Sequence, residues 1–133
     1  MDVPTDQQFD QLISRAMDEL PKRDIENLQN VVITYEDEPN QHQIEKLRLR
    51  HDSLLLGLYE GIPLTKRGMA YNLVLPDKIT LFKLPIVQYS KQTGVELYEQ
   101  IKHTLWHEIA HYYGLNHTDI GQKDGRYREK DSN

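Results

Sequence analysis

The 133-residue chain contains no cysteine. This absence excludes a disulfide framework, a metal site with thiolate ligands and a thiol nucleophile. It suits a reducing compartment, and we expect the protein to be cytoplasmic. Long apolar runs are also missing, since stretches such as Leu54–Leu56 are far too short to cross a membrane. The polar, acidic start MDVPTDQQFD does not have the pattern of a signal peptide.

Basic residues are in the minority, with 16 Lys plus Arg against 21 Asp plus Glu and a formal net charge of -5. Nucleic-acid-binding domains usually carry a basic excess, so we expect no nucleic-acid partner. Because the apolar runs are too short to span a membrane, we expect no membrane partner either. The length is that of one domain. We assign residues 1–120 to a single domain and residues 121–133 to a polar, flexible C-terminal tail, and we expect a monomer.

The N-terminal segment has the pattern of an amphipathic helix used for packing. Thr5 can act as N-cap, and Gln8 three residues later completes a capping box. Pro21 marks the end of the helix. Apolar residues recur between them at helical spacing: Phe9, Leu12, Ile13, Ala16, Met17 and Leu20.

Three further segments have the composition of β-strands, namely Val31–Glu36, Leu54–Glu60 and Lys78–Lys83. Turn residues bound them, and Pro85 follows the third. Residues 40–52 are polar and predict a loop or a short helix. A second long helix is predicted from Thr93 or Gly94 to Tyr113, with Gly114 as its C-terminal cap. Helices and strands in this order predict an α+β fold.

The second long helix carries the sequence HEIAHYYGLNH. His107 and His111 are four residues apart, so they lie on one face of the helix and can bind one Zn²⁺. Glu108 lies beside the metal, where it can take a proton from zinc-bound water as general base. Gly114 allows a sharp turn, after which His117 can complete three protein ligands and leave the fourth position open, as in catalytic zinc sites. We therefore expect one Zn²⁺ per chain, although the same donors also accept Co²⁺, Ni²⁺ or Mn²⁺.

The HExxHxxGxxH pattern resembles that of metzincin zinc peptidases, but all methionines lie before the motif, so the Met-turn of those enzymes is missing. The chain is more similar to small bacterial zincin-like metallopeptidases, from about Phe9 to Ile120, although an acidic residue is common in them at the position of His117. The similar blocks are Ala16–Pro21, Glu36–Pro39, Leu55–Arg67, Pro76–Ile86 and His103–Gly114. The resemblance implies a minimal zincin-like fold, in which a small mixed β-sheet packs against an N-terminal helix and a C-terminal active-site helix.

Two functions remain open at this stage. The first is zinc-dependent hydrolysis of peptide bonds in a peptide or protein substrate. The second is a zinc-stabilised peptide- or protein-binding module of zincin ancestry with little or no hydrolytic activity. The intact Glu108 favours the enzyme, because a pure binding module needs no general base.

Several supporting roles also stay open. Either Leu54–Glu60 or Lys78–Lys83 could pair with extended substrate through main-chain hydrogen bonds, or both could be internal strands. His103, one turn before the motif, is either an alternative metal ligand or a residue behind the ligands, or else a half-exposed helix residue. Asp119 either orients an imidazole or belongs to a plain loop. Candidates for stabilising the oxyanion are Tyr59, Lys66, Arg67, Tyr112, Tyr113 and Tyr127.

Overall fold

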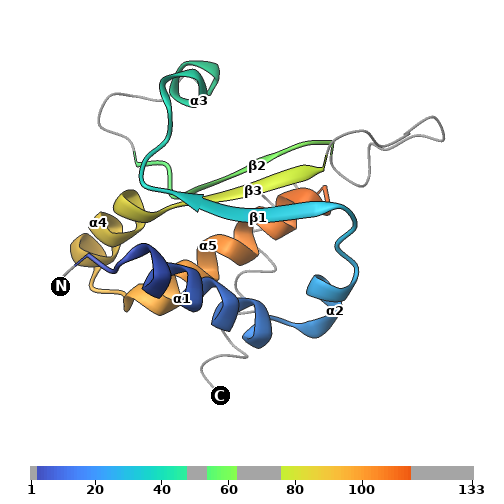
Figure 1. Ribbon diagram of the computed structural model, residues 1–133, viewed down its shortest axis with the longest axis horizontal. Coiled ribbons are helices and arrows are strands. Elements are labelled where there is room, and N and C mark those ends of the chain that lie inside the picture. The colour runs from blue at the N-terminus through green and yellow to red at the C-terminus, as the bar shows by residue number, and fades with distance from the viewer. Residues whose placement is uncertain (1–2, 48–53, 63–75, 115–133) are drawn as a thin grey trace.

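The computed structural model describes residues 3–47, 54–62 and 76–114 (Figure 1). In chain order its elements are α1 (Asp6–Glu19), α2 (Lys22–Glu26), β1 (Val31–Glu36), α3 (Gln41–Lys46), β2 (Gly57–Glu60), β3 (Asp77–Phe82), α4 (Lys83–Thr93) and α5 (Leu97–Tyr112). None of the helices in these three ranges is long and apolar enough to cross a membrane. The proposed tail, residues 121–133, lies outside the described residues, so its character stays a prediction.

The three strands form one mixed sheet in the order β1-β3-β2. β1 runs parallel to β3, with Ile33 opposite Ile79, whereas β2 runs antiparallel to β3, with Gly57 opposite Leu81. β3 therefore has a partner on both sides, which excludes its pairing with a substrate strand. β2 lies at the edge of the sheet, and no other described strand pairs with its outer side.

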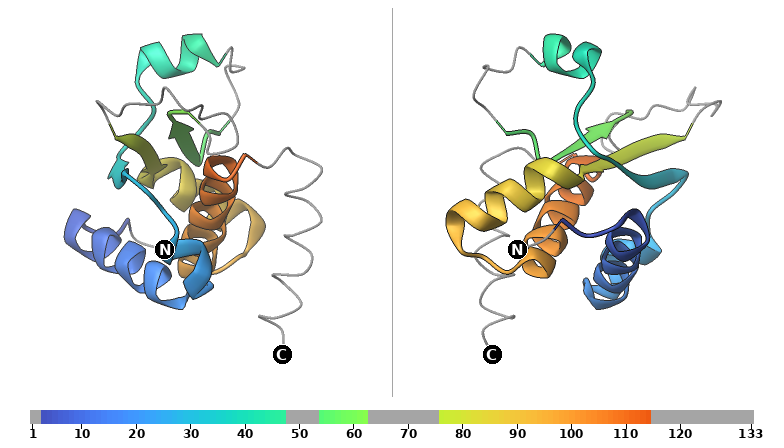
Figure 2. Two further views of the ribbon diagram at one scale, coloured as in Figure 1. Left: turned by 90° about the vertical axis from the view of Figure 1, so that its right-hand side faces the viewer. Right: turned by 60° about the vertical axis from the view of Figure 1, so that its left-hand side comes forward.

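The hydrophobic core lies between the sheet and the helices α1 and α5 (Figure 1). Ile79 and Leu81 of the central strand are fully buried in it, as are Phe9 of α1 and Leu105 of α5. Turned views show α5 between α1 and α4 (Figure 2). The predicted α+β fold is confirmed: a small mixed sheet packs on an N-terminal and a C-terminal helix.

Local sequence signals correctly predicted the first elements. The Gln8 backbone N–H donates to Thr5 Oγ1 at 3.1 Å, and the Thr5 backbone N–H donates to Gln8 Oε1 at 2.9 Å. These two bonds are the capping box, and α1 ends just before Pro21. β1 covers the predicted residues. The predicted strand over residues 54–60 is shorter, since only Gly57–Glu60 pair as a strand.

The prediction was wrong for residues 83–96, where it had no helix before the last one. α4 follows β3 directly, and Pro85 lies in its first turn. Backbone N–H groups in a first turn have no intrahelical acceptor, so a proline there costs the helix no hydrogen bond. Gly94 has a φ of 79° and ends α4 in the left-handed conformation. The last helix therefore begins only at Leu97. Its predicted end is right, because Gly114 has a φ of 82° just after it.

Candidate active site

The two histidines of the motif lie next to each other on α5. The ring centroids of His107 and His111 are 4.9 Å apart, with the ring planes at 73°. Both side chains are half-buried. Two imidazoles at this spacing on one helix face fit as two of the ligands of a tetrahedral Zn²⁺.

The third predicted ligand, His117, lies outside the described residues, as do Asp119, Lys66, Arg67 and Tyr127. Within residues 3–47, 54–62 and 76–114, no three His, Cys, Asp or Glu side chains come together as a metal-binding group. The described part of the chain thus presents a histidine pair, and the third ligand stays a prediction.

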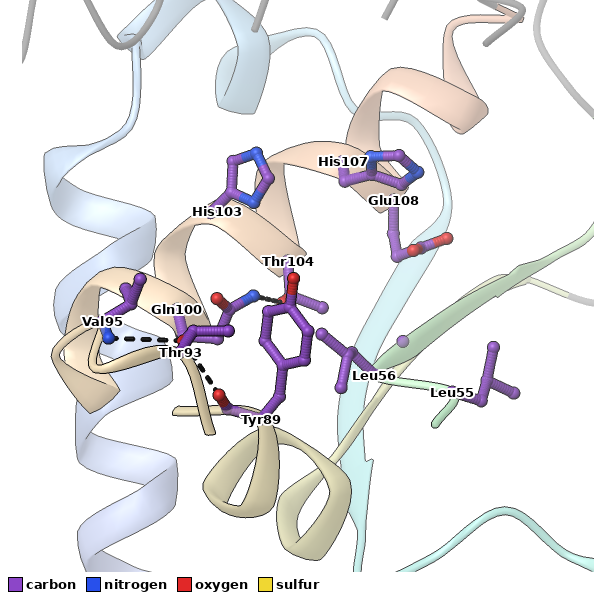
Figure 3. Close-up of a pocket in the computed structure, with 11 residues that line it drawn as sticks. Leu55, Leu56, Tyr89, Thr93, Val95, Gln100, His103, Thr104, His107 and Glu108 are labelled. Carbon is purple, nitrogen blue, oxygen red and sulfur yellow. Dashed lines mark hydrogen bonds between the residues drawn. The ribbon is translucent and has the colours of Figure 1, made fainter. Parts of the chain in front are cut away.

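Glu108 is 7% exposed, on the side of α5 that faces the segment leading into β2 (Figure 3). Burial raises the pKa of its carboxyl group to about 7, against a smaller lowering by a hydrogen bond from the Tyr59 backbone N–H. A carboxyl group whose pKa lies near the working pH can both accept and return a proton. This is the property that a general base in hydrolysis needs.

Gly57 lets β2 approach α5 closely at this point. A Cβ atom on Gly57 would lie 2.9 Å from Thr104 Cγ2 and 3.1 Å from Glu108 Cγ. The first distance is shorter than side chains tolerate, so glycine is required by space. Sequence reasoning missed this role, although a glycine inside a strand pattern is a known signal of close backbone approach.

The register of the sheet directs backbone groups of β2 outward. The Phe82 N–H donates to the Leu56 carbonyl at 2.9 Å, so Leu56 and Phe82 form a hydrogen-bonded pair of the antiparallel ladder. Because such pairs alternate, the N–H and C=O groups of Gly57 and Tyr59 point away from β3. The Tyr59 N–H accordingly meets Glu108 instead of the central strand.

Three tyrosines proposed as oxyanion donors use their hydroxyl groups elsewhere. Tyr59 donates to Asp77 Oδ2 at 2.5 Å. The Tyr112 hydroxyl accepts from the Gln29 backbone N–H at 2.9 Å, and Tyr113 donates to the Asp24 carbonyl at 2.7 Å. The last two bonds hold the C-terminal end of α5, next to His111, against the chain before β1.

A pocket of about 510 Å³ opens beside Glu108, between α5, α4 and the segment before β2 (Figure 3). His103 lies in its wall and is half-buried, which leaves both interpretations of this residue open. The described lining residues are Leu55, Leu56, Gly57, Tyr89, Thr93, Val95, Gln100, His103, Thr104, His107 and Glu108. Sequence reasoning did not find this pocket, because its far wall belongs to α4 and to the turn after it.

Comparison with known protein families gives one match over most of the chain. The model of the zincin-like metallopeptidase family matches residues 28–126, a range that includes all three strands and the histidine motif. The chain belongs to the zincin-like metallopeptidase family. No curated protein shows significant similarity to it. The family agrees with the resemblance seen in the sequence, and its name indicates zinc-dependent hydrolysis of peptides.

Proposed function

We propose that this zincin-like protein is a zinc-dependent peptidase with Glu108 as its general base. The observation that supports this proposal best is the position of Glu108, buried at the end of a pocket and adjacent to the histidine pair. A carboxylate has no packing reason to lie there, because burying it costs free energy that a neutral side chain would not.

The histidine pair and the predicted His117 would hold the metal, one Zn²⁺ per chain. When bound, zinc would polarise the peptide carbonyl group and lower the pKa of the attacking water to about 7. Glu108 accepts one proton from the attacking water while the water oxygen bonds to the carbonyl carbon. It returns the proton to the amide nitrogen as the C–N bond breaks, so an acid and an amine leave.

We further propose that a peptide or protein substrate lies extended along the outer edge of β2. The N–H and C=O groups of Gly57 point away from the sheet there, next to Glu108, which accepts from the Tyr59 N–H. An edge strand with outward N–H and C=O groups can bind an extended peptide as one more strand. We also propose a monomer located in the cytoplasm. The acidic balance argues against nucleic-acid partners, and the absence of cysteine suits a reducing compartment.

The decisive experiment is cleavage of a diverse peptide library by the zinc-loaded protein and by Glu108→Ala. We expect cuts only with the wild type, while both proteins bind zinc equally. Glu99→Ala is the matched control, because Glu99 lies on the same helix with its side chain 47% exposed. Cleavage by Glu108→Ala at the wild-type rate would disprove the proposed mechanism.

The metal site has its own test. His107→Ala and His111→Ala should each weaken zinc binding by at least about a hundredfold. Even substitutions of residues that only support metal ligands lower metal affinity about 10–100-fold. His42→Ala, an exposed histidine on α3, is the control and should bind zinc as the wild type does. Unchanged zinc affinity in both α5 variants would overturn the ligand assignment.

The alternative function is a zinc-stabilised module that binds a peptide or protein without cutting it. It is favoured by one observation: the hydroxyl groups of Tyr59, Tyr112 and Tyr113 are bonded within the fold, away from any oxyanion. In that case zinc raises the melting temperature, the library stays intact, and Glu108→Ala binds peptides as tightly as the wild type.

A further inference from the structure

One buried carboxyl group takes no part in the proposed reaction. Asp77, the first residue of β3, is 3% exposed, and strand alternation puts it on the core face of the sheet with Ile79. Burying a carboxyl group costs free energy unless it is hydrogen-bonded, so an aspartate here needs specific partners. We propose that Asp77 and Tyr59 act as a pair of positioning residues, which hold β2 where it orients Glu108 for the reaction. This inference rests on the proposed role of Glu108 as general base.

The pair joins the edge strand to the central strand through their side chains. The Tyr59 hydroxyl donates to Asp77 Oδ2 at 2.5 Å, the length of a strong hydrogen bond to a charged acceptor. Tyr59 lies opposite Ile79 in the sheet, so Asp77 is its diagonal neighbour, which a long aromatic side chain can reach. The bond therefore adds a side-chain connection to the backbone ladder between β2 and β3.

The chain that leaves β2 covers the same carboxyl group. Gly61 has a φ of 155°, and a Cβ atom on it would overlap with Cβ, Cγ and Oδ1 of Asp77. No side chain fits in that space, so glycine lets the backbone pass directly over Asp77. The C-terminal end of β2 is thus fixed to Asp77 by the Tyr59 hydroxyl and by close packing at Gly61.

The ring of Tyr59 contacts the end of the helix that carries the motif. It meets the Tyr112 ring edge-on, with centroids 6.2 Å apart and ring planes at 84°. Tyr112 is fully buried, directly follows His111, and accepts a hydrogen bond from the Gln29 backbone N–H. Tyr59 is therefore fixed at its hydroxyl by β3 and at its ring by α5.

The backbone of Tyr59 connects this placement to Glu108. The Tyr59 N–H donates to the Glu108 carboxyl group. β2 is also close enough that a Cβ atom on Gly57 would lie 3.1 Å from Glu108 Cγ. A shift of this four-residue edge strand would move the hydrogen-bond donor of Glu108 and change the direction of its carboxyl group. Catalysis is sensitive to such a change, because a displacement of about 1 Å can cost about 100-fold in rate.

The test removes the Tyr59 hydroxyl and keeps its ring and backbone. Zinc-loaded Tyr59→Phe, assayed well below its melting temperature, should lower kcat at least about tenfold. Most of the loss in kcat/KM should fall on kcat, because Glu108 acts in the chemical step. Asp77→Ala should have a similar effect, and the double variant should be no slower than the slower single variant, because both changes break one bond. Asp77→Asn keeps an acceptor oxygen for the hydroxyl and should retain most of the wild-type kcat.

Lys83→Met is the matched control, because it breaks a buried polar contact at the other end of β3. Lys83 directly follows β3, is 7% exposed, and donates through Nζ to Asp6 Oδ1 at 2.8 Å. This variant should lower the melting temperature and leave kcat unchanged. Wild-type kcat in Tyr59→Phe, or an equal loss of kcat in Lys83→Met, would overturn the proposed positioning role while leaving the peptidase mechanism intact.

A second measurement does not depend on hydrolysis and decides the case if the wild type cuts nothing. The backbone amide of Tyr59 is followed by NMR in the zinc-loaded wild type and variants. Glu108→Ala removes the acceptor of this N–H, so the amide proton signal should move upfield and exchange faster with solvent. Asp77→Ala should produce the same two changes, and Lys83→Met neither. A Tyr59 amide that is unchanged in Asp77→Ala would overturn the connection between Asp77 and Glu108.

Discussion

The two long helices α1 and α5 pack on the same face of the sheet but differ in what they bury. The buried residues of α1 are all apolar, namely Phe9, Ile13 and Ala16. α5 buries several polar side chains as well, among them Gln100, Thr104 and Glu108. The first helix is arranged for stability alone. The second gives up stability to hold polar groups at the candidate site, as active sites commonly do.

The largest expected effect tests the stabilising role of α1. Phe9 is fully buried, and its ring packs edge-on against Tyr35 with centroids 5.5 Å apart. Phe9→Ala should lower the free energy of unfolding by about 4 kcal/mol, measured by urea denaturation, because it leaves a cavity in the core. Exposed Leu47→Ala is the control and should change little. A loss below about 1 kcal/mol would show that α1 contributes less than its burial indicates.

The second-largest expected effect is a gain in the free energy of unfolding, caused by a substitution in α5. Because the fold raises the pKa of Glu108 from 4.5 to about 7, the folded protein favours the neutral carboxyl group. The contribution of Glu108 to the stability of the zinc-free protein is therefore fully present below pH 4.5 and is lost as the pH rises through about 7, by about 3 kcal/mol in total. Glu108→Gln should remove this loss, so the zinc-free variant is the more stable protein at pH 8.

The measurement is urea denaturation of both proteins with a chelator present, between pH 4.5 and pH 8. Parallel stability curves for wild type and variant would mean that Glu108 is not the buried, neutral-favouring group described here.

A smaller effect tests the contact between α5 and the edge strand. Gly57→Ala should cost about 2 kcal/mol, because the new Cβ would lie 2.9 Å from Thr104 Cγ2 in a packed region. Adding Thr104→Ser removes that methyl group and keeps the hydroxyl that Gln100 donates to, so it should restore part of the loss. If the double variant is no more stable than Gly57→Ala, the two residues are not in the close contact seen here.

The smallest effects compare the two helix N-termini. Thr5→Ala removes the capping box of α1 and should cost about 1 kcal/mol. The N-cap of α5, Glu96, makes no side-chain cap hydrogen bond among the described residues. Glu96→Asp puts a shorter carboxylate there and should stabilise the protein by up to about 1 kcal/mol. Thermal denaturation of both variants measures these two effects. Equal changes in melting temperature in the same direction would contradict the difference between the two N-termini.

The same contrast explains which elements the sequence could predict. α1 and β1 follow from local signals: a capping box, helical spacing, a stop at Pro21 and a β-branched run. α4 does not, because Pro85 and the β-branched pair Ile86 and Val87 are typical of a strand end. Packing against β3 and α5 overrides those preferences, and much of α4 is buried as a result.

For the site, the division lies between neighbours in sequence and neighbours in space. The spacing of His107, Glu108 and His111 is local to one helix turn, so it could be read from the motif, and the pair lies as expected. Gly57 lies 50 residues before His107 in the sequence, and the far wall around Val95 belongs to α4 and the turn after it. No local pattern connects them to the motif.

The amino-acid sequence by itself determined the chemistry of this protein: an acidic, cysteine-free chain with a zincin motif on a helix whose periodicity and glycine cap are encoded within it. The tertiary structure decided what surrounds that chemistry. It placed β2 at the edge of the sheet beside Glu108, buried that carboxyl group enough to raise its pKa, and closed a pocket with α4. Burial and register arise from contacts between distant segments, and their free energy depends on the whole packed arrangement.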